Sequence, residues 1–149
     1  MAVRKARDNP ELREHLVITQ ALHWWQHEDF WWAHYPSGEH RHGADAAKLK
    51  CMGVRAGVAD FMFLRKDWNG RIVFTEYKPE KGRLSKAQKD FQALCKDFGI
   101  AYRVCHGKEQ MCRQLRLVGA FDPDHEREAV ESILAHDSVH ELVRSRRAA

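Results

Sequence analysis

Mostly apolar side chains recur every three or four positions near the start of the chain, which is the period of an amphipathic helix. These positions are Leu12, Leu16, Thr19, Leu22 and Trp25. Asn9 and Pro10 precede them, and this pair is typical of an N-cap followed by a proline at the first helical position. The pattern predicts a helix over residues 10–27.

The middle of the chain predicts a β-hairpin. β-branched and aromatic residues are frequent in residues 58–64 and 71–78, as is typical of strands. Residues 67–70 lie between them and end in Asn-Gly, a strong signal for a hairpin turn. A turn centred on this segment places residue 60 opposite residue 77 or 78.

The remaining segments complete an alternating pattern. Ser85 and Gln88 have the spacing of a capping box, and they begin a helix that Gly99 ends. Its expected apolar stripe is Ala87, Phe91, Leu94, Cys95 and Phe98. Further expected elements are strands at 30–35 and 100–105, a polar loop at 36–43, and helices at 44–52, 108–117 and 125–144. This order predicts an α/β domain with a mixed central β-sheet flanked by helices, plus a C-terminal helix.

Composition narrows the class of protein. The chain has 149 residues, 44% hydrophobic and 31% charged, which fits one globular domain over residues 1–120 with a helical tail over 121–149. No apolar run approaches the ~20 residues that span a bilayer, and the N-terminus does not resemble a signal peptide. We therefore expect a cytoplasmic protein without a membrane segment.

Net charge and cysteine content bear on the partner of the protein and on possible metal sites. The formal net charge is +4, and the excess of basic residues lies before residue 120, which is compatible with a polyanionic partner. The four cysteines have no C-x-x-C spacing, so reduced, buried thiols are expected. A zinc site built from these cysteines and nearby histidines is the alternative.

The candidate catalytic residues are Asp60, Glu76 and Lys78. Glu76 and Lys78 are two apart on one expected strand, so both face the same side, and the hairpin brings Asp60 beside them. Two carboxylates offer hard oxygen ligands to Mg²⁺, and Lys78 can hold an attacking hydroxide or offset charge on phosphate. The set suits phosphodiester hydrolysis, and the alternative is a solvent-exposed salt bridge between strands.

Four segments carry a resemblance to a known family. They are Gly-Val-Arg-Ala-Gly-Val-Ala-Asp at 53–60, Phe-Thr-Glu-Tyr-Lys at 74–78, Gly-Arg-Leu-Ser-Lys-Ala-Gln at 82–88 and Gly-Ile-Ala-Tyr-Arg-Val at 99–104. His34-Tyr35-Pro36 adds to them. Over about residues 10–118 the chain resembles the VRR-NUC domain of the PD-(D/E)XK nuclease superfamily. Its length is similar to that of the stand-alone viral and bacterial members.

The resemblance implies a restriction-endonuclease-like core that cuts DNA with Mg²⁺ or Mn²⁺. It implies that Asp60 and Glu76 bind the metal with the backbone carbonyl of Tyr77, and that Lys78 is the catalytic lysine. Gln88 matches the family's helix glutamine near the site, and its alternative role is the capping-box partner of Ser85.

The family also places an acid on its first helix, where we choose Glu14 over Glu11. This sequence departs from the family pattern at Ala59, which replaces a common proline, and at Ser37, which replaces a common asparagine. Pro79 follows Lys78 where a small polar residue is commoner. None of these departures removes a ligand.

Several surface features have two interpretations. Four tryptophans suit either base stacking or packing: Trp24, Trp25, Trp31 and Trp32. Four basic residues suit either a DNA-backbone surface or a solvated helix face: Lys81, Arg83, Lys86 and Lys89. A basic loop with His34, His40, Arg41 and His42 suits phosphate contact, a solvated loop or a histidine-based nuclease site. The last of these leaves Glu76 and Lys78 unexplained.

Three functions compete at this point. The first is a Mg²⁺-dependent DNA endonuclease, by resemblance specific for branched or four-way DNA and homodimeric. The second is an idle DNA-binding or recruiting module on the same fold, and the third is a small-molecule metal hydrolase. In the tail, Val130, Ile133, Leu134 and Leu142 need burial against their own domain or a second subunit, and we predict a homodimer braced by the tail.

Overall fold

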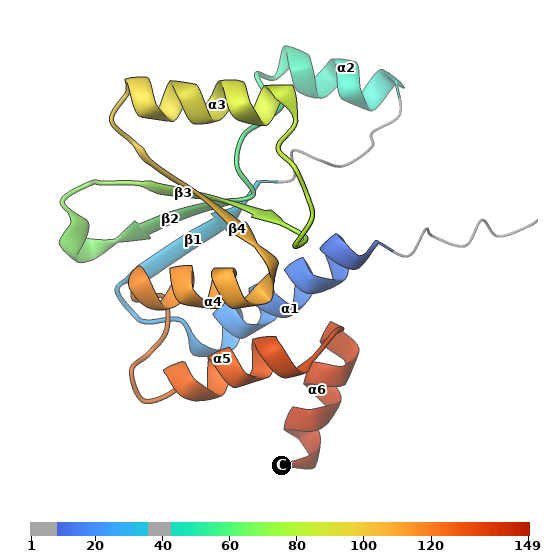
Figure 1. Cartoon of the computed structure of the whole chain (residues 1–149), viewed down its shortest axis with the longest axis vertical. Helices are drawn as coiled ribbons and strands as arrows, with labels where there is room; N and C mark the ends of the chain where they lie inside the picture. The colour runs from blue at the N-terminus through green and yellow to red at the C-terminus, as the bar shows by residue number, and fades with distance from the viewer. Residues whose placement is uncertain (1–8, 36–42) are drawn as a thin grey trace, which may run out of the picture. The chain divides into compact units, whose positions relative to one another are not determined.

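A computed structural model describes residues 9–35 and 43–149 of the chain (Figure 1). The contacts divide the chain into two compact units. The central unit is Glu28–Gly107, and the terminal unit joins the N-terminal segment through His27 to residues Lys108–Ala149. The expected loop at 36–43, including Ser37, His40 and His42, lies outside the described residues apart from Gly43. The boundary after residue 120 stays a prediction.

The central unit contains a four-stranded mixed sheet. Its strands are β1 (Phe30–His34), β2 (Phe61–Arg65), β3 (Val73–Lys78) and β4 (Ala101–His106), in the order β1-β2-β3-β4. The first two neighbouring pairs are antiparallel, and β3 pairs with β4 in parallel. The unit also contains the helices α2 (Gly43–Cys51) and α3 (Lys86–Asp97). The predicted α/β class with a mixed sheet is confirmed.

The hairpin between β2 and β3 forms, with a register slightly different from the predicted one. Phe61 pairs with Thr75, and extending this register by one residue places Asp60 opposite Glu76. The prediction of residue 77 or 78 is therefore wrong by one or two positions. The reason is one turn of 3-10 helix, η1 (Lys66–Trp68), ahead of Asn69 at φ 51°, which centres the connection on Trp68.

Helix α3 crosses from β3 to the parallel strand β4. The predicted capping box at Ser85 is present, and Gly99 ends the helix with φ +67°. The expected apolar stripe is only partly buried. Phe91 packs edge-on against Phe74 and Tyr102 of the sheet, whereas Phe98 is 72% exposed.

The terminal unit is helical. It contains α1 (Pro10–Trp25), α4 (Gly107–Leu117), α5 (Glu126–Ala135) and α6 (Val139–Ala148). Asn9 caps α1 as predicted, since its side chain accepts a hydrogen bond from the Leu12 amide. The largest fully buried side chains of this unit are Val17, Ile18, Leu22, Met111, Leu115, Ile133 and Leu142. None of the helices in the described ranges has the length and apolar character needed to cross a membrane.

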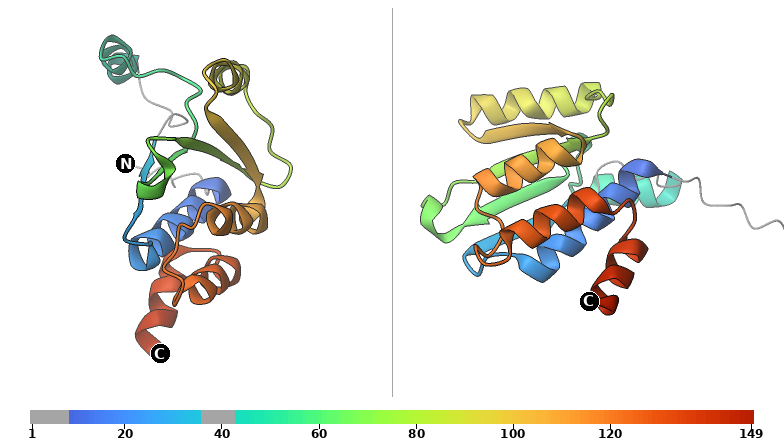
Figure 2. Two further views of the ribbon diagram at one scale, coloured as in Figure 1. Left: turned by 90° about the vertical axis from the view of Figure 1, so that its left-hand side faces the viewer. Right: turned by 60° about the horizontal axis from the view of Figure 1, so that its bottom comes forward.

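The tail is two helices, α5 and α6, so the single helix predicted over 125–144 is wrong (Figure 2). Ser138 caps the second helix by accepting a hydrogen bond from the Glu141 amide, which starts a new helix inside the predicted one. Both helices pack against α1. Ile133 and Leu142 are buried, while Leu134 stays 42% exposed, so the tail buries its apolar side chains within its own chain.

Cation–π contacts hold the end of the tail. The Arg146 guanidinium lies 4.3 Å from the ring centroid of Trp24 and 5.3 Å from that of Trp25. Trp25 is buried, and the two indoles meet edge to face. These two tryptophans therefore pack, which favours the packing interpretation over base stacking for this pair.

Candidate active site

Neighbouring strands bring Asp60, Glu76 and Lys78 to one face of the sheet. Glu76 and Lys78 alternate with Tyr77 along β3, so they share a face. Asp60 immediately precedes β2 and lies opposite Glu76 in the extended register. Asp60 is 8% exposed and Glu76 is fully buried. The hairpin therefore gathers the two carboxylates and the ammonium as the sequence predicted.

The main chain around Asp60 fixes that residue from two directions. The Tyr77 amide donates a 2.8 Å hydrogen bond to Asp60 Oδ2. The Tyr35 amide donates a 2.7 Å hydrogen bond to the Asp60 carbonyl. Because both donors belong to neighbouring strands or their ends, the carboxylate is oriented by the sheet itself.

Lys78 and Gln88 both contact the buried carboxylate of Glu76. Lys78 Nζ lies 2.8 Å from Glu76 Oε1, and the Lys78 side chain is only 12% exposed. Gln88 Nε2, from α3, donates to the same oxygen. A buried carboxylate is costly without such compensation, so Lys78 and Gln88 make this ionised group tolerable.

Gln88 closes the predicted capping box and also contacts Glu76. Its Oε1 accepts a 2.8 Å hydrogen bond from the Ser85 amide, and Ser85 Oγ accepts from the Gln88 amide at 3.2 Å. Its Nε2 is meanwhile free of the cap and contacts Glu76. One amide thus closes the capping box with its acceptor and reaches the carboxylate with its donor.

The donor set of this site fits a hard divalent cation. Asp60, Glu76 and the Tyr77 carbonyl offer only oxygen atoms, which Mg²⁺ and Mn²⁺ prefer. The Lys78 ammonium shows that this position already accepts positive charge beside Glu76. The side chain of Tyr77 is fully buried on the other face of the strand, so only its main chain belongs to the carboxylate face.

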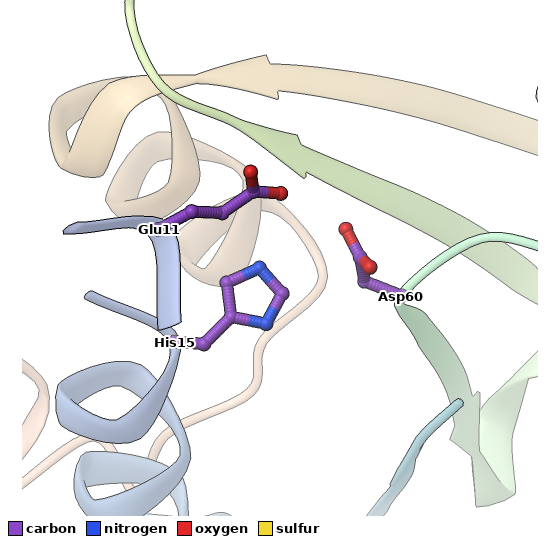
Figure 3. A group of neighbouring side chains, drawn as sticks. All are labelled: Glu11, His15 and Asp60. Atoms are coloured by element: carbon purple, nitrogen blue, oxygen red, sulfur yellow. The ribbon is translucent and has the colours of Figure 1, made fainter. Parts of the chain in front are cut away.

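Helix α1 of the terminal unit carries a second group of polar side chains. Glu11 and His15 lie one turn apart and project from the same side of the helix, with ligand atoms within 4.8 Å of one another (Figure 3). Figure 3 also labels Asp60, at the entrance of β2 in the central unit. Glu11 and Glu14 are both half-buried. Sequence reasoning missed His15, although its i,i+4 spacing from Glu11 was a visible signal.

Tyr102 of β4 also lies on the carboxylate face of the sheet, which the sequence did not predict. Its parallel partner in the sheet is Phe74, two residues before Glu76 and on the same face. Strand parity alone could not reveal this, because the register of β3 with β4 is set across the whole of α3.

Comparison with known proteins supports the same assignment. The family model of the VRR-NUC domain matches residues 12–109. The chain is also similar to a solved structure described as a VRR_NUC domain protein, with 24% identity, a TM-score of 0.54, and 75% of this chain and 94% of that chain covered. No curated protein matches the chain. The family match spans more than half of the sequence and includes the whole carboxylate site, so this protein belongs to the VRR-NUC domain family, a family of nuclease type.

Proposed function

We propose that this protein is a metal-dependent DNA endonuclease that hydrolyses phosphodiester bonds in the cytoplasm, with Mg²⁺ as its cofactor and Mn²⁺ as a substitute. The observation that carries the proposal is the set of Asp60, Glu76 and Lys78 on one face of a hairpin. The chain belongs to a family of nuclease type, and two carboxylates with a lysine are the groups that metal-dependent phosphodiester hydrolysis requires. A basic net charge agrees with a DNA substrate.

The residues divide the chemical work among them. Asp60, Glu76 and the Tyr77 carbonyl would hold the cation, which when bound lowers the pKa of water and stabilises charge on phosphate oxygens. Lys78 Nζ, a cationic donor beside Glu76, can hold the attacking water or offset the charge that develops on phosphate. Gln88 keeps the Glu76 carboxylate in place from α3.

An acid on α1 is part of the proposal by resemblance to the family. We propose Glu14 for this role, with Glu11 as the alternative. The variants Glu14→Gln and Glu11→Gln remove one negative charge at nearly constant volume, so they separate the two candidates. We expect the first to lower the cleavage rate more than the second, and the reverse result assigns the role to Glu11.

A surface for the DNA backbone lies along the segment that follows the site. Its exposed cations are Lys81, Arg83, Lys86 and Lys89. Lys86 already pairs with Asp90 at 2.8 Å, so its contribution is expected to be the smallest. Replacing the other three by glutamine should weaken DNA binding and reduce its dependence on salt.

Cleavage of a DNA panel tests the proposed activity. Plasmid, linear, flap and four-way DNA are incubated with the protein, with and without Mg²⁺, beside Asp60→Asn, Glu76→Gln and the control Asp67→Asn. Asp67 is exposed in the hairpin connection and pairs with Arg65. We expect Mg²⁺-dependent nicking by wild type and the control, with four-way DNA preferred, and no cleavage by the two site variants although they still bind DNA.

Contrary results have definite meanings. Cleavage by either site variant at the wild-type rate contradicts the metal assignment. Binding without cleavage in Mg²⁺ and in Mn²⁺ favours the alternative of an idle DNA-binding module on the same fold.

A homodimer is the remaining element of the proposal. Two symmetric sites suit the two symmetric strands of a four-way junction. Sedimentation velocity of the full chain tests it, and a monomer contradicts it. Because the tail packs on α1, truncation would remove part of the core. Leu134→Asp, on an exposed position of α5, tests the tail instead, and we expect it to weaken the dimer without unfolding the chain.

A further inference from the structure

Tyr102 stands on the carboxylate face of the sheet and has no role in the proposed reaction so far. It pairs with Phe74 in the parallel register of β3 and β4. Its ring packs edge-on against Phe91 of α3, with 6.1 Å between centroids. Glu76 follows Phe74 by two positions, on the same face of β3. The phenol is thus held in place by α3 and lies next to the strand that carries Glu76.

The hydroxyl of Tyr102 is buried and has no hydrogen-bond partner among residues 9–35 and 43–149. Such a group costs stability, so an isolated buried hydroxyl usually has a reason. Burial, followed by the negative charges of Glu76 and Asp60, raises the pKa of Tyr102 well above its ordinary value of 10.0. A phenol keeps its proton at neutral pH, so Tyr102 offers a buried donor on the carboxylate face of the sheet.

We propose that Tyr102 is a positioning residue, whose hydroxyl donates a hydrogen bond to the Glu76 carboxylate when Glu76 binds a divalent cation. This inference rests on the proposed metal site. Lys78 and Gln88 both contact Oε1 of Glu76. A carboxylate that turns toward a cation must be fixed by a donor outside the metal's own ligands. Tyr102 can supply that donor without adding a charge that competes with the cation.

Thr75 offers a matched control in the same strand. Its Oγ1 is also buried with no hydrogen-bond partner in the described part of the chain. Thr75 alternates with Glu76 along β3, so its side chain lies on the other face of the sheet. Thr75→Val and Tyr102→Phe each delete one buried hydroxyl of this kind at nearly constant shape. Only the second deletes it beside the carboxylates.

The test measures cation affinity and metal-free stability on the full chain. Mn²⁺ and Mg²⁺ are titrated by calorimetry into wild type, Tyr102→Phe and Thr75→Val, with Glu76→Gln as the baseline for lost binding. Thermal unfolding of each protein is followed in the presence of a chelator. We expect Tyr102→Phe to bind the cation about 10-fold more weakly, with an unchanged or higher metal-free Tm. Thr75→Val should keep the wild-type affinity.

Three results overturn the inference: equal affinity of Tyr102→Phe and wild type, a Tm of Tyr102→Phe several degrees lower without metal, or no cation binding by wild type. The second would show that the hydroxyl has a structural partner such as a bound water. The measurements contain no DNA, so they separate this inference from the proposed function. Wild type that binds the cation with help from Tyr102 but cuts no DNA contradicts the endonuclease alone.

Discussion

Replacing Gly57 by alanine tests how closely the segment before β2 packs against α3. Gly57 has φ +85°, and a Cβ built there would overlap the carbonyl oxygen and carbon of Ala87 and lie 2.9 Å from the Ala87 Cβ. Ala87 is in the first turn of α3, directly before Gln88, and Gly57 is three residues before Asp60. The backbones of Gly57 and Ala87 therefore meet just before Asp60 and Gln88, which both belong to the carboxylate site.

The expected loss of stability has two parts. A non-glycine residue held at a positive φ costs about 1–3 kcal/mol. Contact with backbone atoms, which cannot rotate away, costs about 1–3 kcal/mol more. Gly53 isolates the first part, because its φ is +86° and nothing lies within 4 Å of its Cβ position. Gly57→Ala should therefore be about 1–3 kcal/mol less stable than Gly53→Ala.

Thermal unfolding followed by circular dichroism measures this difference. For a chain of this length each kcal/mol shifts Tm by roughly 2–4 °C, so Gly57→Ala should melt about 2–12 °C below Gly53→Ala. Cleavage by Gly57→Ala should also fall, because Asp60 and Gln88 are displaced relative to each other. Equal losses of Tm in the two variants would refute the close approach of Gly57 to α3.

Further predictions concern a catalytic group, the tail and the thiols. Lys78→Ala should lower the cleavage rate more than cation affinity, measured by calorimetry, and equal losses would make the lysine structural. Lys108 Nζ donates to the His136 carbonyl at the end of α5 and to Asp137 Oδ1, at 3.0 and 3.1 Å. Lys108→Met should therefore lower the free energy of unfolding in urea by about 1–3 kcal/mol, and no loss would show that Lys108 does not stabilise the tail. Burial raises the pKa of Cys112 to about 11, so this thiol stays protonated in the folded protein while the unfolded thiol ionises near 9.0. The free energy of unfolding should fall between pH 9 and 11, and this fall should be smaller in Cys112→Ala than in wild type.

The hairpin and its site could be predicted because the information is local. Strand parity places Glu76 and Lys78 on one face, and the Asn-Gly turn brings Asp60 near them across a single hairpin. The exact register was wrong, because a 3-10 turn before Asn69 shifts the centre of the connection. The apolar pattern alone does not show that turn.

Two features could not be derived in the same way. Tyr102 reaches the site face through a parallel pairing whose register depends on the packing of α3, a long-range effect. The tail shows a competition between signals, since apolar spacing continues from Val130 to Leu142 and suggests one helix. The Ser138-x-x-Glu141 spacing was present in the sequence, and capping prevailed because it satisfies backbone groups at the start of a second helix.

The side-chain amide of Gln88 contacts two different groups, so few other side chains could replace it. Its oxygen must accept from Ser85 and its nitrogen must donate to Glu76, so the end of the side chain has to be both acceptor and donor. Glutamate would keep the cap but place a second negative charge against Glu76, and lysine would reach Glu76 but abandon the cap. The first turn of α3 therefore also positions a hydrogen-bond donor to the buried carboxylate. When that turn frays, Glu76 loses the hydrogen bond from Gln88.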